Sequence, residues 1–285
     1  MSKVIIKNLS YQYPLGDENA LEDISLKINK GDFLGIVGPN KAGKSTLCKS
    51  LVGLVPHFYN GDFSGEILID DLNTKNHSIS QISLKVGLVF QNPFNQISGA
   101  KLTVYDEVAF GLENIGLPRE KMIERIDYYL KLMDIYDQRA SNPFEISGGQ
   151  MQRLAIASIM AREPDVFVLD EPTSQLDPQG SKEVFNAIHK LSQKDLTVII
   201  VSQKMERLAK YTDNILLLNQ GRVIDYDKKE KIFARDDLEE LGVRPPIYTE
   251  IARKMNLKND KSYYPINRKK LTDLVVKKYG QNFSK

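Results

Sequence analysis

The most informative stretch of the sequence is a glycine-rich segment that follows an apolar run and precedes a predicted helix. It has the pattern G-x-x-x-x-G-K-S, and its residues are Gly38, Pro39, Asn40, Lys41, Ala42, Gly43, Lys44 and Ser45. Glycines let backbone N–H groups approach an anion closely, and a helix N-terminus adds positive partial charge. Lys44 supplies a point charge for outer phosphates, the Ser45 hydroxyl is suited to ligate Mg²⁺, and Thr46 can add a contact. This phosphate loop predicts a site for a nucleoside triphosphate with magnesium.

A second segment that could do chemistry is VFVLDEP, Val166 to Pro172, in which an apolar strand ends on two acidic residues. Ligands of open α/β sheets bind at the carboxyl ends of parallel strands. Asp170 can hold Mg²⁺ there through water or Ser45, and Glu171 is a candidate general base for an attacking water. A helix cap is the structural alternative for such a pair, but the phosphate loop upstream favours the catalytic interpretation.

The elements that must position these residues are short strands alternating with helices. The apolar runs VIIKNL, FLGIVG, VGLVF, VFVLD and TVIIVS predict buried strands. Strand–helix alternation favours a parallel sheet with right-handed crossovers. At the N-terminus, KNLSYQYP and LEDISLKI indicate a small antiparallel sheet. The helical stretch before VFVLD is too long for one crossover, so we expect an inserted helical subdomain at about 92–163. Within it, Pro118 is well placed at a helix start, and another helix is expected from about Ser147 to Arg162.

Length and composition set further limits. The chain has 285 residues, 41% of them hydrophobic and 27% charged, as is usual for a soluble globular protein. No apolar run reaches the ~20 residues of a membrane-spanning helix, and the N-terminus lacks the apolar stretch of a signal peptide. We therefore expect a cytoplasmic protein. The single cysteine, Cys48, excludes an internal disulfide and is expected to be a small buried side chain. A net charge of +2 gives no general argument for binding nucleic acid.

The charge is concentrated at the C-terminus. Residues 251–285 contain 10 Lys and Arg against two acids, Asp260 and Asp273, which leaves +8 in this tail and −6 in the rest of the chain. A basic tail can lie against an anionic membrane surface, or it can simply be solvated. Both interpretations stay open at this stage.

A third motif identifies the family that the sequence resembles. Ser147, Gly148, Gly149 and Gln150, followed by Met151-Gln152-Arg153, resemble the signature of ABC-transporter ATPases. The phosphate loop, Asp170-Glu171 and the later Ser174-Gln175-Leu176-Asp177 make this resemblance specific, and it covers about residues 3–230. It implies an α/β fold: a P-loop (RecA-like) ABC ATPase core with an N-terminal antiparallel β subdomain, an inserted helical subdomain and a short C-terminal extension. The expected domains are a nucleotide-binding domain at 1–232 and an extension with the basic tail at 233–285.

The resemblance also implies roles for individual residues. Tyr13 matches the aromatic that stacks on adenine, and Gln91 matches the glutamine that contacts Mg²⁺ and links to the helical subdomain. Ser147 can cap its helix while the two glycines expose N–H groups at a positive helix end. In this family the signature of one subunit covers the ATP of another, so two ATP molecules join a head-to-tail dimer. Asp177 would lie at that dimer seam.

A narrower resemblance points to the ATPase components of energy-coupling factor (ECF) importers, which take up vitamins and transition metals. It rests on LVPHFYNGDFSGEILIDD, on VGLVFQNPFNQISGAKLTVYDEVAFGLENIGLP and on the segment around GVRPPIYTEIARKM. It implies a second ABC ATPase subunit, a membrane T-component that docks near residues 91–111, and a separate substrate-binding S-component. The chain would then act at the cytoplasmic face of the membrane without binding nucleic acid, and the transported substrate stays open.

Two residues depart from the family pattern. Gln203, after TVIIVS, stands where the family has a histidine that contacts the γ-phosphate, and Lys41 stands at a position that is often glycine. Glutamine can donate a hydrogen bond and orient water, but it cannot carry a positive charge near pH 7. We expect a slowed ATPase, with Glu171 and Gln203 as its catalytic residues. The alternatives are a regulatory nucleotide-binding subunit that pairs with an active ATPase, and a soluble ABC protein of DNA repair or translation. Whether the dimer has identical subunits stays open.

Overall fold

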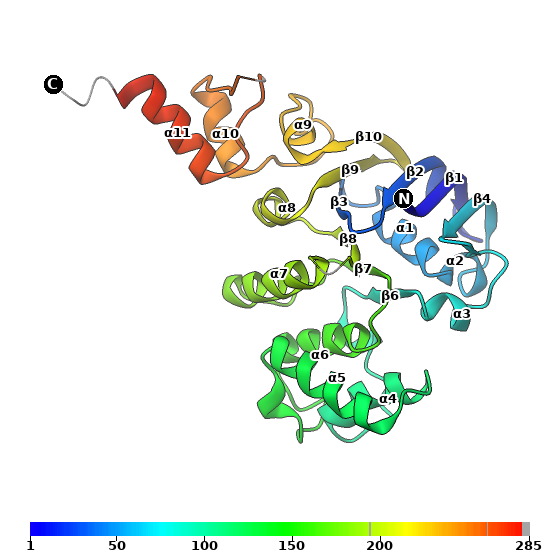
Figure 1. Cartoon of the computed structure of the whole chain (residues 1–285). Coiled ribbons are helices and arrows are strands. Elements are labelled where there is room, and N and C mark those ends of the chain that lie inside the picture. The colour runs from blue at the N-terminus through cyan, green and yellow to red at the C-terminus, as the bar shows by residue number, and fades with distance from the viewer. Residues whose placement is uncertain (194, 261, 281–285) are drawn as a thin grey trace.

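Two β-sheets and the helices around them form the structure, a computed structural model that describes residues 1–193, 195–260 and 262–280 (Figure 1). The strands are β1 (Ser2–Gln12), β2 (Leu21–Asn29), β3 (Phe33–Val37), β4 (Asp62–Ile69), β5 (Leu72–Asn73), β6 (Val86–Val89), β7 (Val166–Asp170), β8 (Thr197–Val201), β9 (Asn214–Asn219) and β10 (Arg222–Lys228). The helices are α1 (Lys44–Leu51), α2 (Leu54–His57), α3 (Ile79–Ser83), α4 (Val104–Glu113), α5 (Arg119–Leu132), α6 (Gly148–Met160), α7 (Pro178–Ser192), α8 (Met205–Tyr211), α9 (Lys229–Phe233), α10 (Ile247–Lys254) and α11 (Arg268–Tyr279). Two 3₁₀ turns are η1 (Pro93–Asn95) and η2 (Tyr136–Gln138).

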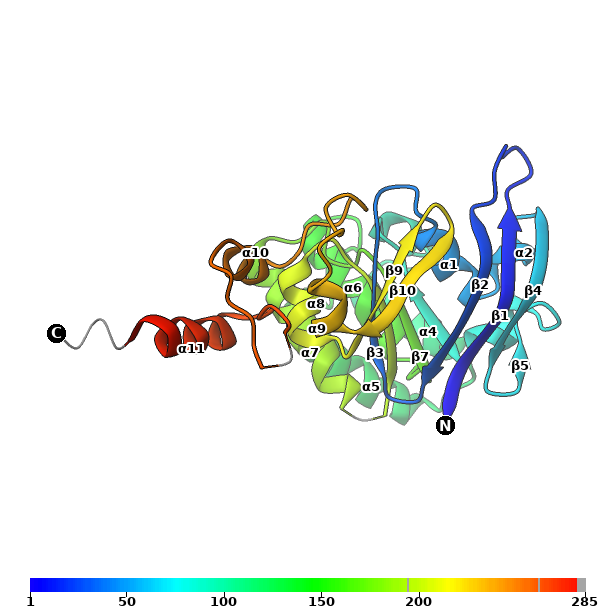
Figure 2. The ribbon, with the colours of Figure 1, turned by 90° about the horizontal axis from the view of Figure 1, so that it is seen from above.

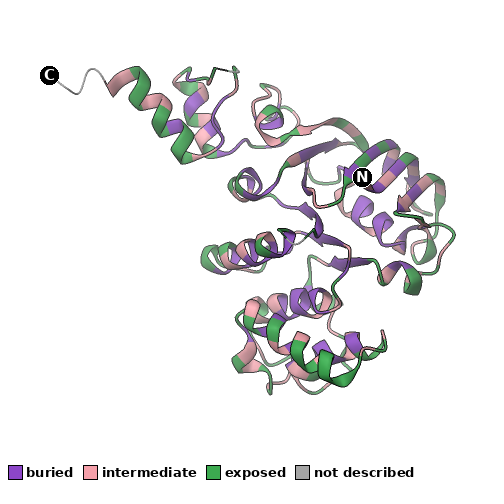
Figure 3. Cartoon of the chain, viewed as in Figure 1, coloured by how far each residue is buried: buried purple, intermediate pink, exposed green. Residues whose placement is uncertain are grey.

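The larger sheet has the order β10-β9-β3-β8-β7-β6, and all its strands except β10 run parallel. Every residue of β3, β6, β7 and β8 is buried, as expected of strands covered on both faces (Figure 3). This confirms the parallel sheet predicted from the apolar runs. Strand β9 was missed, although the apolar run ILLL before Gln220-Gly221 indicates a hairpin. Both turn residues have positive φ, 47° and 74°, as a tight hairpin turn requires.

The smaller, antiparallel sheet has the order β2-β1-β4-β5 and lies beside the parallel sheet (Figure 2). Its inward side chains, such as Ile6 and Ile67, share one apolar core with α1 and with one face of the parallel sheet. The predicted N-terminal antiparallel sheet is therefore confirmed, with β4 and β5 added from later in the chain. Cys48 of α1 is fully buried in this core, as the sequence predicted.

Helices α4, α5 and α6 follow β6 and precede β7, and they form a separate group below the sheet in Figure 1. They share a second apolar core with α7, α8 and the other face of the parallel sheet. Pro118 is the residue before α5, and Ser147 is the residue before α6, so both predicted helix starts are confirmed. This arrangement matches the expected P-loop core with an N-terminal antiparallel sheet and an inserted helical subdomain.

The C-terminal segment adds α9, α10 and α11, and α11 projects away from the rest of the molecule (Figures 1 and 2). Helices α10 and α11 share a small apolar core that includes Ala252, Tyr264 and Leu271. The segment after β10 begins with the short helix α9. Residues 261 and 281–285 of the predicted basic tail lie outside the described part. Within the described ranges, no helix is long and apolar enough to cross a membrane.

Candidate nucleotide site

The phosphate loop connects the carboxyl end of β3 to α1, and its glycines are sterically required. A Cβ atom on Gly38 would lie 2.1 Å from the Leu218 carbonyl oxygen of β9, and one on Gly43 would lie 2.5 Å from the Ala20 carbonyl oxygen. Gly43 also has φ 95°, which side chains other than glycine rarely adopt. The loop is therefore held between β9 and the end of the β1–β2 connection, with α1 starting directly after it.

Lys44 lies over the loop that precedes it. Its Nζ donates to the carbonyl oxygens of Gly38 at 2.8 Å and Pro39 at 2.7 Å. Burial lowers the pKa of Lys44, while the nearby carboxylates of Glu171 and Asp170 partly counter this effect. A half-buried ammonium group at the start of a helix is suited to bind phosphate oxygens.

Asp170 and Glu171 lie at the carboxyl end of β7, facing the phosphate loop. Burial raises the pKa of Asp170, and a hydrogen bond from the Ser45 hydroxyl together with the charges of Lys49 and Lys44 opposes this rise. Glu171 has φ 50°, a left-handed conformation that is uncommon for glutamate, and its N–H donates to the Val201 carbonyl oxygen at 3.0 Å. The backbone of Glu171 is thus held against β8, which fixes where its carboxylate lies.

The Glu171 carboxylate has the environment of a general base. Burial is the largest cause that raises its pKa, and the Gln203 N–H, 3.4 Å from Oε2, partly offsets it. The other oxygen, Oε1, is buried and has no hydrogen-bond partner among the described residues. A general base works best when its pKa lies near the working pH. A raised pKa therefore makes this carboxylate a better proton acceptor near neutral pH. An attacking water would also donate a hydrogen bond to this buried, unpartnered carboxylate oxygen.

These groups surround one cavity of about 340 Å³. It is lined by Tyr13, Ala20, Asn40, Lys41, Ala42, Gly43, Lys44, Ser45, Thr46, Gln91, Asp170, Glu171, Val201 and Gln203. Of these, Ala20 and Val201 carry no sequence signal, because they reach the cavity only through the fold. Gly38 and Pro39 shape the loop without lining the cavity, and Ser147–Gln150 and Asp177 lie outside it. Tyr13 has its hydroxyl 3.2 Å from Thr46 Oγ1, and its ring meets the ring of Tyr11 edge-on.

The oxygen atoms at this site fit a magnesium ion that is shared with a phosphate. Ser45, Gln91 and Asp170 bring a hydroxyl, an amide and a buried carboxylate to the same cavity. Mg²⁺ is commonly held by one or two protein oxygens together with waters and substrate phosphates. In the described part of the chain, no group of three His, Cys, Asp or Glu residues could form a separate metal cage. The donor set therefore suits a nucleotide-bound cation.

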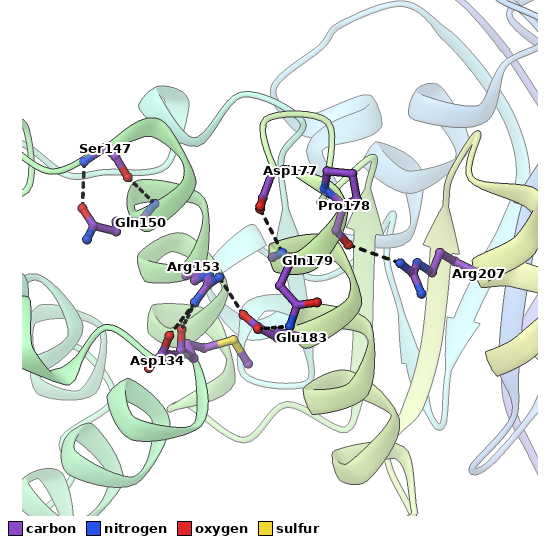
Figure 4. A network of polar contacts seen from close by, with 11 residues as sticks. Asp134, Ser147, Gln150, Arg153, Asp177, Pro178, Gln179, Glu183 and Arg207 are labelled. Carbon is purple, nitrogen blue, oxygen red and sulfur yellow. Dashed lines mark hydrogen bonds and ion pairs between the residues drawn. The ribbon is translucent and has the colours of Figure 1, made fainter.

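The signature residues begin α6 on the helical side of the molecule (Figure 4). Ser147 Oγ accepts the Gln150 N–H at 3.2 Å, and Gln150 Oε1 accepts the Ser147 N–H at 2.9 Å, which forms a reciprocal capping box. One turn later, Arg153 pairs with Asp134 at 3.1 Å and with Glu183 of α7 at 2.9 Å. The signature helix is thus tied to α7 by Arg153, a contact that the signature pattern did not predict.

Asp177 is the N-cap of α7, and its Oδ1 accepts the Gly180 N–H at 2.9 Å (Figure 4). The neighbouring Pro178 carbonyl oxygen accepts from Arg207 of α8 at 3.2 Å. We call residues 172–177, which join Glu171 to α7, the seam loop. Polar contacts from α6 and α8 therefore fix the helix that begins at the end of this loop.

The C-terminal extension also contacts the site, which no local sequence signal indicated. Gly242 lies so close to the phosphate loop that a Cβ atom there would be 3.0 Å from Cβ of Pro39. A few residues later, the Ile247 N–H donates to Glu206 Oε1 of α8 at 3.2 Å. The extension is thus anchored to α8 and to the phosphate loop.

This contact leads to a first prediction, for Gly242→Ala. The alanine would press on the rigid Pro39 ring and shift the phosphate loop by a few tenths of an ångström, so we expect an ATP affinity about fivefold weaker, or about 1 kcal/mol. Because Gly242 has φ 73°, the variant also loses about 1–2 kcal/mol of stability. Calorimetric titration with ATP measures the affinity.

Gly116→Ala is the matched control for this prediction. Gly116 has φ 70°, and a Cβ atom added to it would have no other atom within 4 Å, so its alanine carries the same backbone strain without contacting the loop. We expect equal losses in melting temperature and an unchanged ATP affinity. If both variants bind ATP equally well, the extension does not support the phosphate loop.

The fold and this cavity define a P-loop nucleotide-binding domain, since a phosphate loop and an acidic strand end meet at the carboxyl edge of a parallel sheet. Comparison with known proteins specifies it further. The sequence profile of the ABC transporter family matches residues 21–174. The chain therefore belongs to the ABC transporter family, whose ATP-binding proteins bind and hydrolyse ATP.

Individual relatives agree with this assignment. A protein of Pyrococcus abyssi named as an ABC transporter ATP-binding protein is 44% identical over 88% of this chain and 90% of its own. The energy-coupling factor transporter ATP-binding protein EcfA of Pediococcus pentosaceus is 40% identical over 86% of each chain. The structure of cbiO1 from Clostridium perfringens, part of the ABC transporter complex cbiONQ, superposes with TM-score 0.72 and 30% identity, covering 90% of this chain and 99% of that one. The ATP-binding cassette MJ0796, a dimer bound to ADP and Pi, gives TM-score 0.69 at 29% identity, covering 79% and 98%.

Proposed function

We propose that this protein is the ATP-hydrolysing subunit of an ECF-type importer of a vitamin or transition metal, and that it works at the cytoplasmic face of the membrane. The observation that carries the hydrolytic role is the cavity in which the phosphate loop, Asp170, Glu171 and Gln203 meet. The similarity to EcfA and to cbiO1 supports the importer class. The transported substrate would be chosen by a separate subunit.

In this proposal each residue of the cavity has one task. Backbone N–H groups of the loop and Lys44 bind the phosphates, and the Tyr13 ring stacks on the adenine. Ser45, Asp170 and Gln91 would hold Mg²⁺, which when bound neutralises phosphate charge. Glu171 accepts a proton from the water that attacks the γ-phosphorus, and the bond to the β,γ-bridging oxygen breaks to give ADP and phosphate. The Gln203 amide donates to a γ-phosphate oxygen or orients the water.

We further propose that a second ABC ATPase subunit completes each site. The signature residues Ser147–Gln150 lie outside the cavity of their own chain, at the exposed start of α6. Their N–H groups at a positive helix end are suited to contact the ATP of a partner subunit in a head-to-tail dimer. Asp177 would then lie at the seam between the two chains.

The proposed docking surface for the membrane T-component is the region around residues 91–111. Three large apolar side chains are exposed there: Phe94 at 57%, Leu102 at 79% and Phe144 at 51%. Phe144 belongs to this surface because a Cβ atom on Gly99 would lie 3.8 Å from its ring. Several large exposed apolar side chains in one surface region are typical of a protein–protein contact. Since Gln91 begins this segment and lines the cavity, binding of a partner could be coupled to the nucleotide.

A second prediction tests this surface with Phe94→Asp. A carboxylate at the centre of an apolar contact loses about 2 kcal/mol or more of binding energy, so at least about tenfold less membrane T-component should co-purify with the tagged chain. Phe58→Asp is the control, because Phe58 is 67% exposed but lies on another part of the molecule. Equal recovery of the multi-spanning partner with both variants would argue against this docking surface.

Gln203 favours a second candidate function, that of a regulatory subunit whose partner ATPase does most of the hydrolysis. A neutral amide at this position weakens the stabilisation of γ-phosphate charge. The buried, unpartnered Glu171 oxygen instead favours a working site. Measuring ATP hydrolysis by the assembled complex, with Glu171→Gln in this subunit only, separates the two functions.

A further inference from the structure

A lysine that belongs to none of the recognised motifs holds the seam loop in place. Lys204 directly follows Gln203 and precedes α8, and its Nζ donates to the Thr173 carbonyl oxygen at 2.9 Å. Thr173 is only 1% exposed, so its carbonyl needs an internal partner. The Lys204 N–H in turn donates to Ser202 Oγ at 3.1 Å, which fixes the start of the side chain. We call Ser202–Lys204 the switch segment.

The loop that Lys204 contacts joins the proposed base to the proposed seam residue. Glu171 at one end has left-handed backbone torsions, and the Glu171 carbonyl oxygen accepts the Ser174 N–H in a tight turn. At the far end, Arg207 donates to the Pro178 carbonyl oxygen. Two cationic side chains, three residues apart on one short segment, therefore hold the start of the seam loop and the first residue of the helix that follows it.

Lys204 also brings a positive charge to the position beside the neutral Gln203. Burial is the largest cause that lowers the pKa of Lys204, and Arg207 adds to it, whereas Glu171 and Asp177 both oppose the fall. Its ammonium group is thus within electrostatic reach of both carboxylates. The hydrogen bond to the Thr173 carbonyl oxygen fixes the position of this ammonium group.

We propose that Lys204 is a positioning residue for ATP hydrolysis, which anchors the seam loop and supplies, next to Gln203, a fixed positive charge near Glu171. The inference rests on the proposed hydrolytic function of the same site. It differs from the role of Lys44, because Lys204 acts through the loop between Glu171 and Asp177 and does not line the nucleotide cavity.

The test compares Lys204→Met and Lys204→Arg, each in the wild-type chain and in the Gln203→His background, as assembled complexes. We expect Lys204→Met to lower kcat about tenfold while ATP affinity stays within about twofold, because the phosphate loop is untouched. Lys204→Arg keeps the charge and a donor, so it should recover most of the rate. In the Gln203→His background the added histidine supplies positive charge, and Lys204→Met should lower kcat less than about threefold.

Lys121→Met is the control, since Lys121 is an exposed residue of α5 on the helical side of the molecule. Melting curves establish that each variant folds. An unchanged kcat in Lys204→Met would overturn the inference. Equal losses in both backgrounds would overturn the role of the positive charge, because an anchor alone acts regardless of residue 203. Either result leaves the proposed function intact as long as Glu171→Gln still abolishes hydrolysis. If wild type and Glu171→Gln hydrolyse ATP equally slowly, the proposed function itself fails.

Discussion

Glu171→Gln is expected to lower kcat for ATP hydrolysis by about 10²–10⁴-fold, the range that a general base contributes. The substitution keeps the size of the side chain and the hydrogen-bond acceptor for Gln203 N–H, but it removes the group that takes a proton from water. ATP binding should change little, because the phosphate loop and Lys44, which we propose bind the phosphates, are unchanged. The variant should therefore accumulate as an ATP-bound dimer.

Steady-state phosphate release and size-exclusion chromatography with ATP and Mg²⁺ measure the two effects. Glu124→Gln is the control, since Glu124 is an exposed residue of α5 on the helical side of the molecule. A wild-type rate no higher than that of Glu171→Gln would mean that this cavity only binds nucleotide. In that case a partner ATPase must supply the turnover, as in the regulatory alternative.

The same variant should also change how stability depends on pH. Burial raises the pKa of Glu171 in the folded protein, so the stability contributed by this carboxyl is full below its unfolded pKa and is lost as the pH rises through the folded pKa. Glutamine has no charge to bury, so Glu171→Gln should melt at a higher temperature than wild type near neutral pH, by about 2 °C per kcal/mol. The difference should shrink on acidification.

The second large effect is expected for Gln203→His, which should raise kcat about ten- to a hundredfold. A histidine at this position can make a charge-assisted hydrogen bond to the γ-phosphate, worth about 1.5–3 kcal/mol. The position is suitable because Gln203 lines the cavity and its N–H already faces Glu171. ATP affinity should rise less than kcat, since the developing charge is greatest in the transition state.

The experiment measures kcat and KM for ATP between pH 6 and 9. The increase in kcat from Gln203→His should become smaller as the pH rises above the pKa of the histidine, which is near 6.5 when unperturbed. Gln193→His is a matched exchange at the exposed end of α7, far from the motifs, and should leave the rate unchanged. No gain from Gln203→His in a complex that otherwise hydrolyses ATP would show that the glutamine is already adequate for its role.

Much of the fold could be predicted because its signals are local. The phosphate loop is encoded by Gly38 and Gly43, whose backbones contact Leu218 and Ala20 with no space for a side chain. Apolar runs marked four of the strands that build the parallel sheet, and Pro118 and Ser147 marked two helix starts. Strand β9 was not predicted, although its apolar run ILLL directly precedes the Gln220-Gly221 turn.

The motif residues of the candidate site were predicted from the sequence, but the residues that support them were not. The glycine pattern, the acidic strand end and Gln203 each carry their chemistry in neighbouring residues, and the strand order brings them to one edge of the sheet. The hydrogen bond of Lys204 to Thr173, by contrast, joins residues 31 positions apart in the sequence. A lysine after a strand has no local feature that distinguishes this role from a solvated surface charge.

The sequence by itself determined that this chain is an ABC-family ATP-binding protein, because backbone conformation, strand burial and phosphate binding depend on residue types at fixed short spacings. Only the tertiary structure decided which side chains support that site. Arg153 links α6 to α7, Lys204 holds the seam loop, and Gly242 packs against Pro39. These contacts join segments that lie far apart along the chain. They exist only because packing of the two apolar cores fixes where every segment lies.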